Sequence, residues 1–123
     1  HEKSSWTFNN KFFGDKEINK SLKFMEMTYE LLRKNDIKMS VGIYPWPAQI
    51  LYDNSQSKIV KLISNFCKNK CEFFFNNFID FFNEATFMDK EKIISSYYIK
   101  GDVHFNSLGN EKIFQNFVRV FKN

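Results

Sequence analysis

The feature that most constrains the fold is a change of hydrophobic period near residue 36. In residues 37–43, apolar side chains alternate with small or polar ones, which is the period of a β-strand. In residues 16–35, apolar side chains instead recur at spacings of three and four, as on one face of a helix. The members of that stripe are Ile18, Leu22, Met25, Tyr29 and Leu32. A helix that leads directly into a strand favours an α/β fold.

The middle of the chain continues this alternation. Pro45 and Pro47 end the first strand, because proline cannot donate to a strand ladder, and a loop is expected through residues 52–55. A second helix is expected from about Ser57 to Phe66. The continuous apolar run at residues 73–75 is typical of a strand buried on both faces.

The C-terminal half is less regular. Residues 76–100 fit either short helices or extended stretches, and a last amphipathic helix is expected from Ser107 to about Phe121. The order helix, strand, helix, strand, helix predicts parallel strands with right-handed crossovers. A doubly wound sheet of five strands needs roughly 150 residues, at about 30 for each βαβ unit. We therefore expect residues 1–123 to form a partial doubly wound, three-layer α/β/α fold.

The composition fits a globular chain and excludes several classes of protein. The 123 residues correspond to one domain or part of one, and 16 phenylalanines can supply a dense apolar core. No apolar run approaches ~20 residues, so no transmembrane segment is expected in this chain. The net charge of +4 is dispersed rather than clustered, which argues against nucleic-acid binding.

The oxidation state of the two cysteines would indicate whether the protein resides in an oxidising compartment. Cys67 and Cys71 have no second cysteine or histidine pair nearby, so no metal site is expected, and no cofactor is expected either. They form either a short-loop disulfide, which implies an oxidising compartment, or two free thiols.

The N-terminal residues 1–14 look extended or irregular. Their aromatic side chains are expected to pack onto the body of the domain: Trp6, Phe8, Phe12 and Phe13. The chain begins without an initiator methionine or an apolar leader, which we interpret as a cut or processed end.

The segment KGDVHFNSLGN, residues 100–110, carries the sharpest chemical signal. Asp102 lies two residues before His104, in a loop that opens directly into the last helix. A carboxylate at Nδ1 fixes the imidazole tautomer and stabilises the imidazolium, which leaves Nε2 free to take a proton from a nucleophile. The pattern therefore predicts an acid–base pair. The alternative is a capped turn that contains a hydrogen-bonded histidine.

Residues 101–110, followed by an amphipathic terminal helix, resemble the last conserved block of the SGNH (GDSL) esterase and acyltransferase family. Residues 41–49, with their two prolines, look like the late strand and Pro-rich loop of bacterial members. The resemblance implies a flavodoxin-like, SGNH-type fold. It also implies that His104 is the general base of a Ser-His-Asp triad and that Asp102 is its orienting acid.

Candidate substrate-binding residues lie beside these two. Tyr44, Trp46 and Gln49 follow the carboxyl end of the first strand, where an acyl or sugar group can bind; the alternative is that Trp46 is a lid over the core. By the resemblance, Asn106 and Gly109 shape the turn into the last helix, and simple capping explains them equally well. We include Asn106 among the substrate-binding candidates.

The family's earlier blocks, which carry the nucleophilic serine and the oxyanion donors, have no counterpart here. None of the ten serines lies in a strand-to-helix elbow flanked by glycine. Without a nucleophile, an acid–base pair performs acyl transfer poorly. The resemblance thus implies that this chain is the C-terminal portion of an SGNH-like domain. The nucleophile-bearing remainder is either an N-terminal portion missing from this chain, a separate partner chain, or a part lost in evolution.

Two functions follow as expectations. The first is part of a serine esterase or O-acyltransferase that acts on acyl esters, such as O-acetyl groups of surface polysaccharide, with this chain inactive alone. The second is a non-catalytic binding or structural fragment that pairs with another chain. The resemblance to this family, together with the cysteine pair, favours the periplasm or the cell surface.

Overall fold

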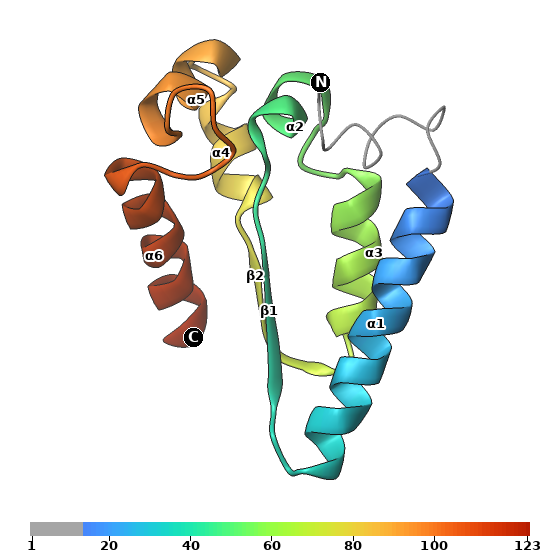
Figure 1. Cartoon of the computed structure of the whole chain (residues 1–123). Coiled ribbons are helices and arrows are strands. Elements are labelled where there is room, and N and C mark those ends of the chain that lie inside the picture. Colours follow the sequence, from blue (N-terminus) through green and yellow to red (C-terminus); the bar gives the residue numbers. More distant parts are fainter. Residues whose placement is uncertain (1–13) are drawn as a thin grey trace.

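The structure is a computed structural model that describes residues 14–123, and within them helices alternate with two strands (Figure 1). The mixed α/β class expected from the sequence is confirmed. The aromatic side chains of residues 6–13 lie outside the described residues. The elements are α1 (Gly14–Lys34), β1 (Met39–Ile43), α2 (Pro47–Tyr52), α3 (Lys58–Cys67), β2 (Cys71–Asn76), α4 (Phe78–Glu84), α5 (Lys90–Tyr97) and α6 (Ser107–Phe121).

The two strands run parallel, as expected, and have helices on both sides. α1 and α3 lie on one side of the sheet, and α6 lies on the other (Figure 1). The aromatic residues of β2 hold α6 in place: the Phe75 ring centroid lies 4.9 Å from that of Phe117, and the Phe73 centroid lies 5.3 Å from that of Phe121. Residues 73–75 are only half-buried, since the sheet around them is narrow.

Local sequence sets the first helix–strand boundary. Helix α1 ends with Asp36 in the left-handed region, at φ 55°, and with the Ile37 N–H donating to the Leu32 carbonyl at 3.0 Å. Ile37 is therefore used to close the helix, and β1 begins at Met39, two residues later than the alternation alone predicts. The third helix agrees with the prediction, because the Ser57 hydroxyl accepts from the Val60 N–H and caps it.

Three short helices were not resolved from the sequence. Pro47 is the first residue of α2, a position where its missing N–H costs nothing. The loop that was expected to follow the first strand, through residue 55, is therefore helical from Pro47 to Tyr52. Residues 78–84 and 90–97 are helical rather than extended. The last helix matches its expected range of Ser107–Phe121.

The most deeply buried cluster lies above the carboxyl ends of the strands, where α2, α4 and α5 meet (Figure 1). It consists of Ile50, Phe81, Ile93 and Tyr98. At the opposite end of the sheet, a disulfide between Cys67 and Cys71 joins the end of α3 to the start of β2. Within residues 14–123, none of the helices has the length and apolar character needed to cross a bilayer.

Candidate active site

The loop between α5 and α6 presents the predicted pair. The Ile99 N–H donates to the His104 carbonyl at 2.9 Å, and the Asp102 N–H donates to the Ile99 carbonyl at 2.9 Å. Gly101 has φ 75°, in the left-handed region that glycine adopts without steric cost, so the chain can reverse there. These bonds hold Asp102 and His104 on one tight turn.

The two side chains are in direct contact. Nδ1 of His104 lies 2.8 Å from Oδ1 of Asp102, and the Val103 N–H donates to the same oxygen at 2.6 Å. The hydrogen bond from His104, with a smaller contribution from Val103, lowers the pKa of the Asp102 carboxyl. An ionised carboxylate can only accept, so Nδ1 carries the proton of this hydrogen bond, and in a neutral imidazole the lone pair is then on Nε2.

The imidazole is open to solvent. The side chain of His104 is 73% exposed, and that of Asp102 is 46% exposed. Within residues 14–123, no serine, threonine or cysteine side chain hydrogen-bonds to Nε2. The contact therefore fixes the orientation of the imidazole and leaves Nε2 without a hydroxyl or thiol partner among residues 14–123.

The turn into α6 is fixed by Asn106 and Gly109. The Asn106 side chain accepts from the Gly109 N–H at 3.0 Å and donates to the Ser96 carbonyl at 2.8 Å. A Cβ on Gly109 would lie 2.2 Å from the Tyr97 carbonyl oxygen, so only glycine allows α6 to approach α5 this closely. Asn106, a substrate-binding candidate from the sequence, uses both ends of its amide within the turn.

The loop is also tied to the end of β1. The buried Tyr98 hydroxyl donates to the Pro45 carbonyl, and burial raises the pKa of Tyr98. The ring centroids of Tyr44 and Phe105 lie 5.0 Å apart. Asp102 and His104 are thus carried at the carboxyl edge of the parallel sheet, which is where open α/β folds bind ligands.

A groove of about 820 Å³ opens beside Asp102, between α2, α5 and the loop. Trp46 and Asp102 line the same groove, so the structure brings these two candidates together. Gln49 is instead buried, and its side-chain oxygen accepts from the Trp46 N–H at 2.8 Å. Tyr44 packs against Phe105 outside the groove. The other apolar residues of the groove include Pro47, Leu51, Ile94, Ile99 and Val103.

A polar cluster that the sequence does not predict supports the loop between α5 and α6. Glu84 of α4 accepts from the Tyr97 hydroxyl at 2.8 Å and from the Lys112 ammonium at 2.6 Å. Burial, and then the bond to Glu84, raises the pKa of Tyr97 to about 12. The cluster links α4, α5 and α6; its only trace in the sequence is a charged residue among apolar neighbours.

A second missed residue joins the two strands. Asn77 is buried, and both its backbone N–H and its side-chain amide donate to the Ile43 carbonyl, at 3.0 and 2.9 Å. It therefore fixes the carboxyl end of β1 against the residue that follows β2. An asparagine directly after an apolar strand was the available signal.

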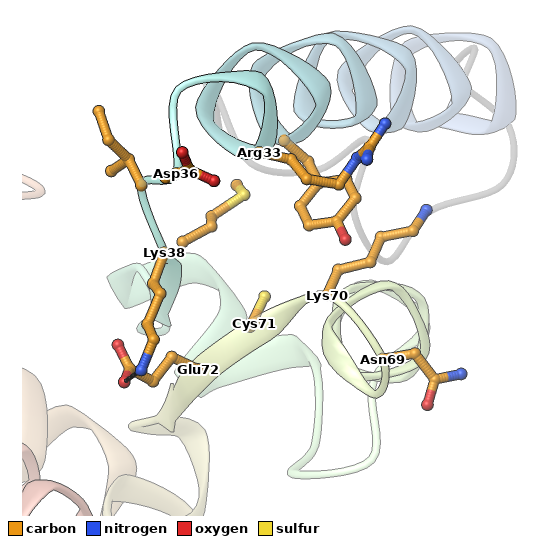
Figure 2. A pocket seen from close by; sticks show the side chains of 10 residues that line it. Arg33, Asp36, Lys38, Asn69, Lys70, Cys71 and Glu72 are labelled. Atoms are coloured by element: carbon orange, nitrogen blue, oxygen red, sulfur yellow. Dashed lines mark hydrogen bonds and ion pairs between the residues drawn. The ribbon is translucent and has the colours of Figure 1, made fainter.

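A separate hollow of about 500 Å³ lies at the amino ends of the strands (Figure 2). Lys38 and Glu72 point toward one another there, with Nζ 2.6 Å from Oε1. Lys70 pairs with Glu26 across α1 and the start of β2. These basic groups already have carboxylate partners, so the hollow carries little net charge to attract an anion. Arg33, at its rim, pairs with Glu30 at 2.8 Å.

In the part of the chain that the structure describes, no three His, Cys, Asp or Glu side chains are grouped so as to hold a metal ion. Comparison with protein-family models, with curated proteins and with solved structures gives no match to this chain. What the chain does must therefore be inferred from the geometry of the site itself.

Proposed function

We propose that this chain supplies the His–Asp half of a Ser-His-Asp triad in an SGNH-type serine esterase or O-acyltransferase. The observation that carries the proposal is the 2.8 Å contact between His104 Nδ1 and Asp102 Oδ1, on a turn that leaves Nε2 unengaged by any hydroxyl of residues 14–123.

The chemistry follows from that contact. Nε2 of His104 takes the proton of a serine hydroxyl as the serine oxygen attacks the ester carbonyl. Asp102 stabilises the resulting imidazolium, which then donates its proton to the leaving alcohol. Water or a sugar hydroxyl releases the acyl group in the second half of the cycle, with His104 again acting as the base.

We also propose that the nucleophile-bearing portion lies outside residues 14–123 and that the two strands belong to a larger doubly wound, flavodoxin-like three-layer sheet. Helices on both sides of the strands support this, as does the position of the pair at the carboxyl edge (Figure 1).

The groove that Asp102 lines, although His104 is not among its lining residues, supports an acyl ester as the substrate, such as an O-acetyl group on carbohydrate. Its walls are mainly apolar, and Trp46 offers a flat ring on which a sugar can pack. The disulfide between Cys67 and Cys71 supports an oxidising location, the periplasm or the cell surface.

The test is ester cleavage by the natural gene product, assayed with p-nitrophenyl acetate and with a fluorophosphonate probe. His104→Ala should lower kcat on the order of 10³-fold or more, because the serine loses its base. Asp36→Asn is the matched control: the residue is exposed, and asparagine tolerates its left-handed backbone.

Near-normal turnover in His104→Ala would exclude a triad role for this histidine. The other candidate is a non-catalytic fragment that pairs with another chain, which is favoured by the lack of a serine, threonine or cysteine hydrogen bond to the His104 ring within residues 14–123. It predicts no fluorophosphonate adduct on the natural gene product.

A further inference from the structure

A single peptide group after β1 is held by two buried side chains. This peptide joins Pro45 to Trp46. Its carbonyl oxygen accepts the hydrogen bond of the Tyr98 hydroxyl, and its N–H donates to Oε1 of Gln49 at 2.8 Å. Tyr98 is 3% exposed and Gln49 is 5% exposed, so both bonds are shielded from water. The orientation of this peptide plane is therefore fixed on both of its polar sides.

The backbone that follows is fixed as well. Trp46 is the N-cap residue of α2, and its carbonyl oxygen accepts from the N–H groups of Gln49 and Ile50, at 2.9 and 3.1 Å. Its own N–H is the group that Gln49 accepts. Both polar backbone groups of Trp46 are thus engaged within α2, so the indole side chain leaves the backbone from a fixed point.

The groove beside the His104 turn lies between two antiparallel helices. Trp46 and Leu51 line the wall that α2 forms, and Tyr98, the C-cap residue of α5, belongs to the opposite wall. The start of α2 meets the end of α5 through the bond from Tyr98 to the Pro45 carbonyl. The end of α2 meets the start of α5 through Nζ of Lys90, which donates to the Leu51 carbonyl at 3.0 Å. The two walls are therefore joined at both ends.

The two ends of the groove differ in what lies beside them. Tyr98 begins the loop that carries Asp102 and His104, so its bond to β1 lies at the end nearest that turn. Asp102 and Val103 of this loop line the groove together with Trp46. The indole therefore lies at the end of the groove where the proposed reaction takes place.

Tyr98 is also bonded into the turn itself. It forms an isolated antiparallel bridge with Phe105, and the two ring centroids lie 4.7 Å apart. The N–H of the next residue, Ile99, donates to the His104 carbonyl at 2.9 Å. A displacement of Tyr98 is therefore transmitted to His104 through one hydrogen bond and one ring contact.

Core packing alone does not require the polar atoms of these side chains. Tyr98 belongs to the most deeply buried apolar cluster, where the ring of a phenylalanine would fill the same space. A buried hydroxyl or amide persists where it has a hydrogen-bond partner. For Tyr98 and for Gln49 alike, that partner is the peptide that carries Trp46.

We infer that Tyr98 and Gln49 are positioning residues: together they hold the Pro45–Trp46 peptide, and thereby hold the Trp46 ring where it receives the substrate beside the His104 turn. The inference rests on the proposed function for the substrate, an acyl ester. Tyr98 holds both the ring and the turn, whereas Gln49 holds the ring alone. Substitutions at the two positions should therefore have different effects.

Fluorine NMR of protein labelled with 5-fluorotryptophan tests the placement of the ring, with the Trp46 signal assigned through Trp46→Phe. Tyr98→Phe removes only the hydroxyl, and Gln49→Met removes the acceptor at a similar side-chain length. Each variant should shift and broaden the Trp46 signal. The imidazole NMR signals of His104 should change in Tyr98→Phe and stay the same in Gln49→Met.

Turnover of p-nitrophenyl acetate by the natural gene product tests the consequence for the reaction. In Gln49→Met, KM should rise about 10-fold, the size of one lost aromatic contact, while kcat stays within about twofold. In Tyr98→Phe, the same rise in KM should accompany a fall in kcat on the order of 100-fold, because displacement of a reacting group by about 1 Å has an effect of that size.

Ser57→Ala is the matched control. The Ser57 side chain is also buried and its hydroxyl also has a backbone partner, the Val60 N–H, but it caps α3 and does not line the groove. Its loss should lower stability without changing the Trp46 or His104 signals. Urea denaturation of all three variants establishes how far each is destabilised.

An unchanged Trp46 signal in Tyr98→Phe and Gln49→Met, or in whichever of them folds, would overturn the inference. An equal change in Ser57→Ala would overturn it as well, since the effect would then follow stability rather than position. If the wild type shows no turnover but the NMR signals change as expected, the esterase proposal falls and the positioning role stands. Normal turnover with unchanged signals would mean the reverse.

Discussion

The two ends of the sheet differ in how completely their polar groups are used. At the amino end, Lys38 and Lys70 each have a carboxylate partner, and the surrounding side chains are largely exposed. At the carboxyl end, the turn that carries His104 is anchored by buried groups, yet Nε2 of the ring is unengaged by the described residues. A side chain that is held in one orientation by its neighbours, while one of its polar atoms has no partner among the described residues, indicates a functional site better than a high density of charge does.

The rigid support has identifiable parts. Tyr98 ties the start of the loop to Pro45, and Asn106 ties its end to α5. Glu84 holds Lys112 of α6 and Tyr97 of α5 together. The hollow at the amino end is built instead from surface ion pairs, which are worth about 0–1 kcal/mol each. We therefore expect the stability of the molecule to depend far more on the carboxyl end.

The variant with the largest expected effect on the free energy of unfolding tests whether stability depends mainly on the carboxyl end of the sheet. Gly109→Ala places a Cβ 2.2 Å from the Tyr97 carbonyl oxygen, which forces α6 away from α5. We expect the free energy of unfolding to fall by about 3 kcal/mol, measured by urea denaturation. Gly42→Ala is the matched control: its Cβ would meet only the Phe75 Cβ, at 3.8 Å, and should change stability by less than about 1 kcal/mol. Equal effects from the two variants would show that the α5–α6 contact is loose.

The elements with strong local signals were predictable from the sequence. The stripe beginning at Ile18 identified α1, Ser57 identified the start of α3, and the alternation up to Ile43 identified β1. The contact between Asp102 and His104 was predictable for the same reason, since two residues of one turn can meet without help from the rest of the fold.

The features that could not be predicted from the sequence depend on contacts between residues that lie far apart in the chain. Pro47 ends a strand or begins a helix equally well, and only packing against α5 decides for α2. The bond from Asn77 to the Ile43 carbonyl spans 34 residues, and the bond from Lys112 to Glu84 spans 28. A local pattern marks Asn77 and Glu84 as polar residues among apolar neighbours, but it does not indicate their partners, because long-range contacts are set by topology rather than by period.

The next-largest effect on the free energy of unfolding concerns the amino end of the sheet. The disulfide between Cys67 and Cys71 closes a short loop, and removing it should lower the free energy of unfolding by about 2 kcal/mol, through the entropy of the unfolded chain. The double variant Cys67→Ala, Cys71→Ala tests this by urea denaturation, and a reductant should affect only the wild type. The hydrogen bond between His104 and Asp102, followed by the imidazole NMR signals, should be unchanged. A shift in those signals would mean that the two ends are coupled.

The last comparison sets one ion pair at each end of the sheet side by side, and its Lys38→Gln variant has the smallest expected effect on stability. The Lys38–Glu72 pair has side chains 75% and 37% exposed, so Lys38→Gln should change stability by less than about 0.5 kcal/mol, and added salt should remove even that difference. In the Lys112–Glu84 pair the side chains are only 20% and 11% exposed, so Glu84→Gln leaves a poorly solvated ammonium and should cost about 2 kcal/mol. Urea denaturation of both variants at low and high salt measures the contrast. If Lys38→Gln proves as costly as Glu84→Gln, the hollow at the amino end is more than a solvated surface, and its basic groups become candidates for a binding site.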